Sequence, residues 1–567
     1  MTDPATSSEG IKIHPGSGRR KAPRFPKGRV LDESDSIEIR DILGEAPRNR
    51  DLLIEFLHLI QDKKGHLPAG LLQALAEEMQ LPMAEVYEVA SFYAHFDIVR
   101  DHDPVPASTT VRVCDSLSCM LQGAEALFTS LEKMSLPDVR IVRAPCMGRC
   151  DQAPVCEIGH RHVDLATVES AVESIESGNR EPKIPNYQTL NARLEAGGYN
   201  VLRACIRGDR TPEDVITTLS DSGLRGLGGA GFPTGRKWNL VKAERGPRLI
   251  AVNADEGEPG TFKDRYYLER EPHAFLEGVL IAAWAIEAEA VYIYLRDEYP
   301  AVREILLKEI AAVKAEGLAE HATLHLRRGA GAYICGEESA MIESIEGKRG
   351  LPRHRPPYVA QVGIFGHPTL VNNVETLMWV PKILEKTPDW FASQGVRGAK
   401  GLRSYSVSGR VKNPGVKLAP AGTTALELIE EYCDGMADGH NFKAYLPGGA
   451  SGGILPARMA DLPLDFGRLE EHGCFVGSHA VVILSDQDDM KDVARNLMAF
   501  FEDESCGQCT PCRQGTEKSK ILMSEASWDL DTLSDLATVM ADASICGLGQ
   551  AAPNPLLSVM KYFPEEL

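Results

Sequence analysis

Several common features are missing from this sequence. Its first residues are polar, so no secretory signal peptide is expected. The most apolar stretch, residues 274–295, is interrupted by Glu277, Glu287 and Glu289, which argues against a membrane span. Basic charge is in deficit, and the formal net charge of −20 disfavours nucleic acid as a partner. We therefore expect a cytoplasmic protein that neither spans a membrane nor binds nucleic acid.

Disulfide bonds are also not expected. The thirteen cysteines are an odd number and occur in clusters, which in a chain without an export signal favours metal ligation. The length of 567 residues predicts several domains, because single cores stop growing near about 250–300 residues.

The N-terminal region divides into two parts. Residues 1–47 are rich in Pro, Gly and Ser and contain a basic run, which predicts a disordered basic tail. A docking arm for an acidic partner is the alternative. Within residues 48–105 apolar side chains recur at helical spacing, and Pro68 and Pro82 stand where new helices would begin. This pattern predicts a bundle of three or four helices.

Two pairs of cysteines follow predicted strands within residues 106–185. The strands are expected at 109–114 and 139–143, and the cysteine spacings are C-x4-C and C-x3-C. The four cysteines are Cys114, Cys119, Cys146 and Cys150. One βαβ unit could bring these thiolates together around a [2Fe–2S] cluster or a zinc ion. Zinc sites usually use C-x2-C pairs, so the spacing favours iron and sulfur.

A glycine-rich loop, GLRGLGGAGFPTGRKW, begins at Gly223 and contains six glycines in its first thirteen residues. Such a run is unsuited to helix or strand, but its bare amides can approach an anionic ligand closely. Gly226, Gly228 and Gly231 match G-x-G-x-x-G. However, residues 212–222 before them predict a capped helix where a dinucleotide fingerprint needs a strand. The ordinary dinucleotide fold is therefore disfavoured, whereas a bound flavin or dinucleotide phosphate is not.

Further polar segments follow predicted elements of the same domain, residues 186–402. A strand at 248–253 runs into ADEGEPGT, residues 254–261, whose carboxylates could accept hydrogen bonds from ribityl or ribose hydroxyls. A solvated acidic turn is the alternative. A second glycine loop, residues 329–338, ends on paired carboxylates at a predicted helix start, and residues 371–376 offer amides suited to a flavin edge.

Residues 403–490 predict a small β-grasp-like α+β domain. Strands are expected near 405–411 and 480–484, with a helix at 424–434. The run GGASGG, residues 448–453, indicates either an anion-binding loop or a surface turn. The turn is favoured because no basic residues lie nearby in the sequence.

The last segment, residues 491–567, carries a C-x2-C-x2-C motif and one distant cysteine. The four residues are Cys506, Cys509, Cys512 and Cys546. Three thiolates on one loop with a remote fourth are typical of a [4Fe–4S] cluster, and zinc is the alternative.

These motifs resemble two subunits of complex I. The helical bundle with C-x4-C and C-x3-C resembles the 24-kDa type of [2Fe–2S] subunit, and four segments resemble the 51-kDa type of flavin subunit. The four segments are GLRGLGGAGFPTGRKW, NADEGEPGTFKDR, GAYICGEES and NNVET. The resemblance implies that FMN is held by Gly226, Gly228, Lys237, Asn253, Asp255, Glu256, Tyr333, Gly336, Glu337, Asn372, Asn373 and Thr376. It implies that the nicotinamide dinucleotide contacts Phe232, Lys237, Glu258, Glu338 and Tyr358, with Glu258 and Glu338 as the catalytic candidates.

The implied fold class is multidomain α/β and α+β. It comprises a helical bundle with a thioredoxin-like [2Fe–2S] domain, a Rossmann-like FMN domain, a β-grasp-like domain and a C-terminal helical [4Fe–4S] bundle. The fusion further resembles the β subunits of NAD-dependent formate dehydrogenases. That resemblance implies a diaphorase that receives electrons from a molybdenum or tungsten α subunit with further iron–sulfur clusters and reduces NAD⁺. The [2Fe–2S] centre is expected off the main electron route. Alternatives are the diaphorase subunit of an NAD-reducing hydrogenase and a fused complex I module.

Overall fold

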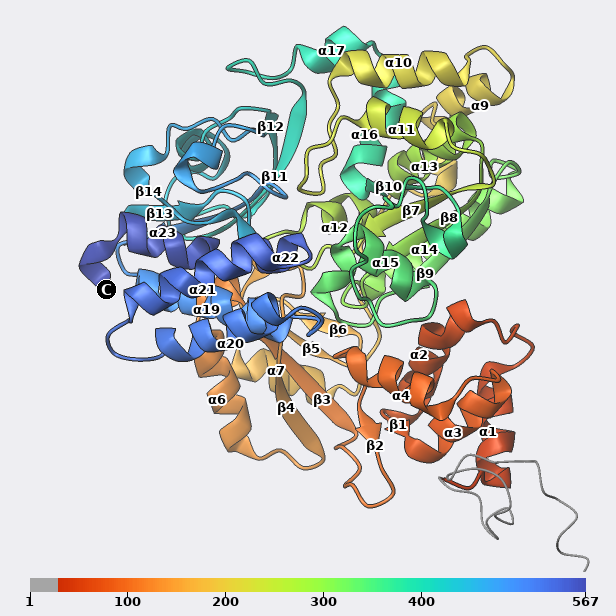
Figure 1. The fold of residues 1–567 in the computed structure, drawn as a ribbon, viewed down its shortest axis with the longest axis horizontal. Coiled ribbons are helices and arrows are strands. Elements are labelled where there is room, and N and C mark those ends of the chain that lie inside the picture. Colours follow the sequence, from red (N-terminus) through yellow and green to blue (C-terminus); the bar gives the residue numbers. More distant parts are fainter. Residues whose placement is uncertain (1–28) are drawn as a thin grey trace, which may run out of the picture.

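The computed structural model describes residues 29–567, so most of the predicted basic tail lies outside the described residues. Five units follow one another along the chain (Figure 1). A helical bundle and a small sheet unit form the lower part of the view, and a parallel-sheet unit lies at the upper right. A second sheet unit lies at the upper left, with the C-terminal helices below it.

The N-terminal bundle contains four helices and one pair of short parallel strands. They are α1 (Glu33–Leu43), α2 (Leu53–Lys64), α3 (Ala69–Glu78), α4 (Met83–Phe92), β1 (Leu67–Pro68) and β2 (Ile98–Val99). Pro68 and Pro82 directly precede α3 and α4, as predicted. Helix α1 corrects the prediction of a disordered tail to residue 47. Asp32 caps it, and Ile39 and Leu43, four residues apart on one face, are buried where the helix packs on α3.

The following unit is the predicted βαβ arrangement extended by a hairpin. Its sheet has the order β4-β3-β5-β6, with β3 and β4 parallel and the other neighbours antiparallel. The strands are β3 (Thr109–Cys114), β4 (Val139–Ala144), β5 (Cys156–Ile158) and β6 (Arg161–Val163). The helices are α5 (Leu117–Leu121), α6 (Ala124–Met134) and α7 (Val168–Glu176).

The largest unit is built on a four-stranded, fully parallel sheet of order β10-β7-β8-β9. Its strands are β7 (Arg248–Ala254), β8 (Ala288–Leu295), β9 (Thr323–Arg328) and β10 (Thr369–Asn373). The helices before or between them are α8 (Leu190–Glu195), α9 (Asn200–Ile206), α10 (Pro212–Ser222), α11 (Thr234–Lys242), α12 (Lys263–Leu268), α13 (Pro272–Ile286), α14 (Pro300–Ala315) and α15 (Glu338–Ile345). Helices α16 (Val374–Glu385) and α17 (Pro388–Ala392) follow β10. Because all strands run the same way, their carboxyl ends meet at one edge, where a ligand crevice is expected.

Two details of this unit agree with the sequence analysis. Helix α10 precedes the glycine loop and is capped by Thr211, so the loop follows a helix as predicted. The apolar stretch, residues 274–295, forms most of α13, which is buried along nearly its whole length, and then strand β8. Its Glu277 is tolerated in the core because Arg193 donates a 2.9 Å hydrogen bond to the carboxylate.

The second sheet unit has five strands in the order β12-β11-β15-β13-β14. They are β11 (Leu402–Gly409), β12 (Gly415–Pro420), β13 (Phe442–Leu446), β14 (Leu455–Pro456) and β15 (Ala480–Ser485). The helix predicted at 424–434 is shorter than expected. Thr424 caps a single α turn, α18 (Ala425–Glu427), and a π turn (Leu428–Tyr432) follows it.

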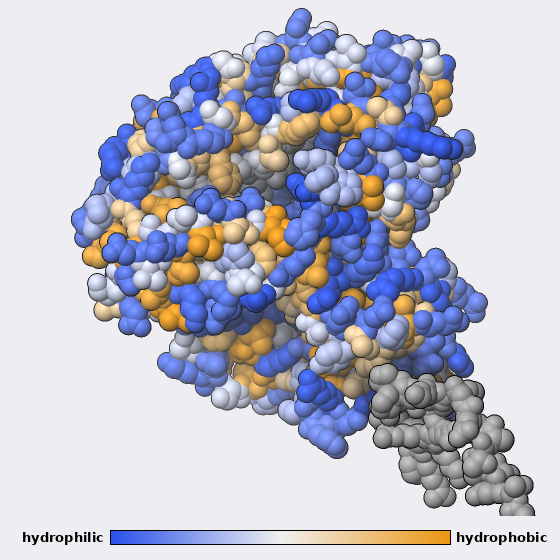
Figure 2. Space-filling view, viewed as in Figure 1, coloured by the Kyte–Doolittle hydropathy of each residue, from blue (hydrophilic) through white to orange (hydrophobic). Residues whose placement is uncertain are grey.

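The chain ends in a bundle of five helices. They are α19 (Met490–Asp503), α20 (Thr510–Met523), α21 (Leu530–Ala543), α22 (Gly547–Ala551) and α23 (Asn554–Tyr562). Figure 2 shows a mostly hydrophilic face on which apolar residues form small patches. Within residues 29–567, no helix combines the length and the apolar character that crossing a membrane requires.

Candidate functional site

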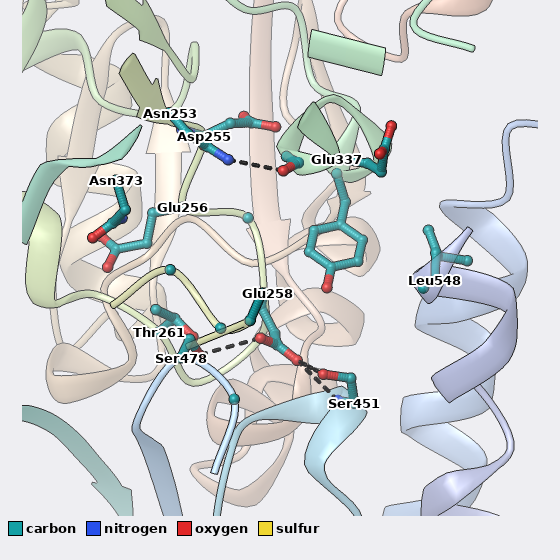
Figure 3. Close-up of a pocket in the computed structure, with 18 of the residues that line it drawn as sticks. Asn253, Asp255, Glu256, Glu258, Thr261, Glu337, Asn373, Ser451, Ser478 and Leu548 are labelled. Atoms are coloured by element: carbon teal, nitrogen blue, oxygen red, sulfur yellow. Dashed lines mark hydrogen bonds between the residues drawn. The ribbon is translucent and has the colours of Figure 1, made fainter. Parts of the chain in front are cut away.

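A cavity of about 360 Å³ opens at the carboxyl edge of the parallel sheet. Three units contribute to its wall: the loops of the parallel-sheet unit, the second sheet unit, and the start of α22 (Figure 3). The predicted site residues that line it are Gly228, Asn253, Asp255, Glu256, Glu258, Tyr333, Gly336, Glu337 and Asn373. The others are not among its lining residues: Gly226, Phe232, Lys237, Glu338, Tyr358, Asn372 and Thr376.

The glycine loop forms one wall with its backbone. It closes on itself, since Gly226 N–H donates to the Phe232 carbonyl at 2.8 Å. It is also fixed to α16, because Leu227 N–H donates to Thr376 Oγ1 at 2.9 Å. In the described part of the chain, no backbone carbonyl accepts the N–H groups of Gly228, Gly229 or Ala230, which line the cavity. These amides are therefore available to a ligand, as the sequence predicted.

The glycines are needed for close approach. A Cβ at Gly228 would stand 3.0 Å from the Cβ of Asn373, and Gly229 has φ +126°, which other residues rarely adopt. Asn372, predicted to hold FMN, accepts a 2.8 Å hydrogen bond from Trp238 Nε1. It thereby ties β10 to α11 behind the loop.

The acidic segment after β7 places its residues in different roles. Asn253 donates to the Gly336 carbonyl at 2.8 Å and so joins the two glycine loops. Among the described residues, no group hydrogen-bonds to Asp255 Oδ2, although that atom is buried. Burial raises the pKa of Asp255 well above its ordinary value. An unpartnered acceptor in the cavity wall fits a ligand with hydroxyl groups, such as a ribityl chain.

Glu256 is held differently from Asp255. Its carboxylate accepts hydrogen bonds from the N–H groups of Asp264 (2.8 Å) and Arg265 (3.0 Å), which begin α12. Tyr299 donates a further bond at 2.9 Å. Burial raises the pKa of Glu256 to about 7. The carboxylate thus positions α12, and its predicted contact with FMN stays a prediction.

Glu258 connects the two sheet units. Ser451 donates to its Oε1 through both N–H (2.9 Å) and hydroxyl, and Ser478 donates to Oε2 at 3.1 Å (Figure 3). Ser451 belongs to residues 448–453, for which the sequence favours a surface turn. That expectation is wrong, because the run is buried where the sheet units meet. Its amide does receive an anion, but the anion is the protein's own Glu258 carboxylate.

The second glycine loop is fixed from both sides of the cavity. Its residues Tyr333–Gly336 form a 3₁₀ turn, and Glu337 caps α15 by accepting from Ser339 and Ala340 N–H. Tyr333 N–H donates to Glu504 Oε2 at 2.8 Å, which attaches the loop to the C-terminal bundle. Carboxylates at a helix start were predicted here, and the cap accounts for Glu337.

Of the residues assigned to the nicotinamide dinucleotide, Glu258 lines the cavity and is buried, whereas the other four lie outside its lining and are at least partly exposed. Phe232 is 39% and Tyr358 55% exposed. Lys237 Nζ lies 3.4 Å from Glu338 Oε2, and Arg355 lies 3.2 Å from Glu338 Oε1. Exposed aromatic side chains and a partly exposed ion pair are groups that a dinucleotide could contact, but the assignment of these residues stays a prediction.

The four C-terminal cysteines surround one small cavity, which is the arrangement a [4Fe–4S] cluster requires. Cys509 and Cys546 are the N-cap residues of α20 and α22, and Cys512 lies in the first turn of α20. Burial raises the pKa of the Cys512 thiol to about 12 and that of Cys546 to about 11. Ile334 and Leu548 line both this cavity and the larger one, so the two sites adjoin.

The four N-terminal cysteines also converge. Cys146 Sγ and Cys150 Sγ are 3.4 Å apart, and both pack against Phe262 of the parallel-sheet unit. The Cys114 hydrogen bond and burial raise the pKa of Cys119 well above its ordinary value, and the charges of Cys150 and Cys146 add to the effect. All four side chains are buried. The donor set and its convergence fit a [2Fe–2S] cluster, as predicted.

Three family models match consecutive parts of the chain, one for each of these sites. They are described as a thioredoxin-like [2Fe-2S] ferredoxin (residues 39–179), a Nuo51 FMN-binding domain (219–382) and an NADH-ubiquinone oxidoreductase-F iron-sulfur binding region (492–567). The fold and sites therefore define a multidomain oxidoreductase that uses FMN, one [2Fe–2S] cluster and one [4Fe–4S] cluster, with NAD(H) as substrate. The fold class and cofactors predicted from the sequence are confirmed.

Individual relatives narrow the class. The second F-type subunit of NADH-quinone oxidoreductase in Rhizobium meliloti is 40% identical over 402 residues, 68% of this chain and 95% of that protein. The F-type subunit of the Aquifex aeolicus enzyme is 40% identical over 401 residues, 68% of this chain and 92% of that protein. A crystal structure of an NAD⁺-reducing [NiFe]-hydrogenase in the air-oxidised state matches with TM-score 0.80 and 32% identity, covering 92% of this chain and 94% of that one. The chain thus belongs to the family of F-type subunits of NADH-quinone oxidoreductase and also carries the thioredoxin-like unit.

Several cavity residues were not anticipated. They are Thr261, Lys263, Asp264, Ser451, Phe475, Ser478 and Leu548. Thr261, Lys263 and Asp264 lie within the quoted segment NADEGEPGTFKDR, so assigning every polar residue of that segment to the site would have included them. Ser451 and Leu548 come from other units, and only the packing of those units brings them to the cavity.

Proposed function

We propose that this chain is the diaphorase subunit of a cytoplasmic NAD-dependent formate dehydrogenase. In that complex a molybdenum- or tungsten-containing α subunit with further iron–sulfur clusters would supply the electrons for NAD⁺ reduction. The observation that carries the electron-transfer role is the shared wall of Ile334 and Leu548 between the larger cavity and the cysteine cavity. Bound flavin supplies the chemistry that converts hydride transfer with nicotinamide into single-electron exchange with clusters.

The chain's own residues orient the reactants and exclude water. Amides of the glycine loop face one side of the cavity, and Phe475 and Leu548 close it from the other units. Glu258 has no free oxygen, because both accept hydrogen bonds from serines of the second sheet unit. We assign Glu258 a positioning role: it fixes the two sheet units relative to each other at the cavity. No nucleophilic side chain is needed, because placing the reactants together is the catalytic contribution.

Glu338 is proposed to position the dinucleotide at the mouth of the site. It is paired with Lys237 and Arg355, and its side chain remains 23% exposed. Because Lys237, Glu338 and Arg355 are already close together, a dinucleotide that contacts them loses less side-chain entropy on binding.

The test of this role is Glu338→Gln. We expect the KM for NADH in dye reduction to rise about 10-fold, the loss of one charge-assisted contact, with flavin content unchanged. The matched control is Glu343→Gln, which lies on the same helix but contacts Arg353 and Lys348. Equal kinetics in the two variants would remove Glu338 from the site.

Two alternatives compete for the identity of the partner, a hydrogenase and a fused complex I module. The NAD⁺-reducing [NiFe]-hydrogenase matches nearly the whole chain, which supports a hydrogenase diaphorase as the second candidate. The complete set of four N-terminal cysteines supports the formate enzyme, because hydrogenase fusions often lack part of that set. Purification of the native complex followed by metal analysis decides between them. Molybdenum or tungsten with formate-dependent NAD⁺ reduction supports the proposal, and nickel with hydrogen-dependent reduction overturns it.

A further inference from the structure

A second group of potential ligands lies outside the flavin and cysteine sites, where three units meet. Its centre is formed by His58 and Asp62 of α2 and by His95, which follows α4. One ligand atom from each of these three residues lies within 4.8 Å of the others. The surrounding groups come from the neighbouring units: Asp297, Arg328 and Gly329 of the parallel-sheet unit and His160 of the thioredoxin-like unit.

The outer ring nitrogens of the two histidines are already engaged. His58 Nε2 lies 2.8 Å from the Gly329 carbonyl, and His95 Nδ1 lies 2.8 Å from Asp297 Oδ2. A carbonyl and a carboxylate only accept, so each of these nitrogens carries the hydrogen. In neutral rings, lone pairs therefore remain on His58 Nδ1 and His95 Nε2.

Those two inner nitrogens are buried, and within residues 29–567 no group hydrogen-bonds to either. His58 is only 1% exposed. Leaving two buried acceptors unsatisfied is unfavourable, and native structures rarely do so without a ligand. An imidazole that donates its outer N–H to a carbonyl or carboxylate and leaves its inner nitrogen free is the common state of a metal-ligating histidine.

The spacing of the rings agrees with ligation. Their centroids are 4.9 Å apart with an interplanar angle of 45°. Two imidazoles on one tetrahedral zinc ion, with Zn–N of about 2.0–2.1 Å, place their ring centres about 5 Å apart. Asp62 follows His58 by four residues on α2, so both side chains lie on one face of the helix.

The charges around the group favour a cation. Arg328 pairs with both Asp62 (2.6 Å) and Asp297 (2.5 Å), so one guanidinium serves two carboxylates. With neutral imidazoles these three groups sum to −1 (two carboxylates at −1 and one guanidinium at +1). The side chain of Asp62 is 35% exposed, which provides access from solvent and room for a water ligand. His160 Nε2 lies 3.6 Å from Asp62 Oδ1 and so borders the group on the side of the thioredoxin-like unit.

We propose that His58, His95 and Asp62 bind one divalent transition-metal ion of the zinc class. All three ligands belong to the N-terminal bundle, and the site is linked to the carboxyl ends of β8 and β9 through Gly329 and Asp297, which hold the other ring nitrogens of the two histidines. His58 and the His95 backbone already contact Gly329 and Ala330, the first residues of the second glycine loop. The metal site therefore stabilises the start of the second glycine loop, which places Tyr333 in the wall of the flavin cavity.

The experiment uses the full chain with flavin and iron loaded. After treatment with a chelator it is titrated with Zn²⁺, and zinc is measured alongside iron and by X-ray absorption at the zinc edge. We expect one zinc per chain at unchanged iron content, with nitrogen and oxygen ligands at about 2.0–2.1 Å. His95→Gln and Asp62→Asn should weaken zinc binding at least about 10-fold. His102→Gln, at an exposed histidine outside the group, should not change it.

Zinc should also raise the thermal unfolding midpoint of the wild-type chain and not that of Asp62→Asn. Asp62 is partly exposed, so this variant keeps the fold in the apo state. Three results overturn the proposal. They are no zinc bound at full iron content, equal zinc in the wild type and both ligand variants, or sulfur ligands at about 2.3 Å, which would place the ion in the cysteine sites.

Discussion

The two cysteine sites use the same donor set but are built in different ways. The N-terminal cysteines are all buried and are covered by another unit through Phe262 and Arg296. Three of the C-terminal cysteines are only partly buried, and their cavity shares Ile334 and Leu548 with the flavin cavity. One site is thus enclosed between units, while the other is separated from the flavin cavity by side chains that line both, Ile334 and Leu548.

The two cysteine sites also differ in the charged groups that lie near them. A hydrogen bond from Cys150 lowers the pKa of Cys146 to about 6, and the positive charge of Arg296 contributes. At the C-terminal site, burial raises the pKa of Cys546 to about 11, and the negative charge of Glu337 adds to the rise. A basic residue, Arg296, therefore lies near the N-terminal cysteines, and an acidic residue, Glu337, lies near the C-terminal cysteines. The contrast predicts different electron affinities and different roles.

The largest expected effect comes from removing one cysteine from each site. Cys512→Ala should reduce NAD⁺ reduction by the assembled complex at least about 100-fold, because the cluster beside the flavin is lost. Cys119→Ala should cost less than about 3-fold if, as we expect, the enclosed site is off the main electron route. Dye reduction by NADH, with iron and flavin analysis, checks that flavin remains in both variants. Equal losses in the two variants would show that both clusters carry the main electron flow.

A second difference concerns stability against pH. Burial raises the pKa of Glu157, on β5 of the enclosed unit, from 4.5 to about 7. The folded state then holds a proton that the unfolded state releases, so stability is greatest below pH 4.5 and falls as pH rises to about 7. Glu157→Gln should reduce this fall by the share of Glu157, on the order of 3 kcal/mol at most, while Glu256 and Glu504, whose pKa values burial also raises to about 7, keep theirs. Thermal unfolding at pH 5 and pH 8 measures it, with exposed Glu517→Gln on α20 as the control. A wild-type profile retained by Glu157→Gln would assign the fall to other groups.

The fold was predictable where short-range signals were strong. The prolines before α3 and α4, the Thr211 cap before α10 and the cysteines at strand ends each fix an element locally. Helix α1 was missed because its flanks are rich in Pro and Gly, and its few apolar residues gain burial only by packing on α3. The π turn after α18 likewise has no signal in the local spacing.

The site was predictable only in part, for a similar reason. Asn253 and Asp255 follow a strand and belong to one motif, so their meeting with the glycine loops could be inferred. Ser451 holds Glu258 across the junction of two units, and Leu548 reaches the cavity from α22. Such contacts depend on the relative placement of whole units. The histidines of α2 and α4 were overlooked because no spacing rule joins residues 58 and 95.

Arg296 offers a smaller, electrostatic test of the enclosed site. Its guanidinium donates to the Cys146 carbonyl at 2.5 Å. Arg296→Gln removes a positive charge beside the cluster that Glu298, 3.1 Å away, offsets in part, and the reduction potential should fall on the order of 50 mV at an effective dielectric near 20. Arg296→Lys keeps the charge and is the matched control. A redox titration followed by electron paramagnetic resonance measures the shift. An unchanged potential in Arg296→Gln would show that the charge of Arg296 does not influence the cluster.

The smallest effect is expected at Glu337, the acidic counterpart of Arg296. Its carboxylate caps α15 and is paired with Arg355, so part of its charge is already compensated. Glu337→Gln should therefore raise the potential of the [4Fe–4S] cluster by only about 20 mV, opposite in sign to the Arg296 effect. Gln keeps an oxygen for the cap, which limits the structural change. The same titration applies, with Glu343→Gln on α15 as the control. If both substitutions moved their clusters in the same direction, the contrast between a basic and an acidic site would be wrong. If Glu337→Gln had the larger effect, Arg355 would not compensate its charge.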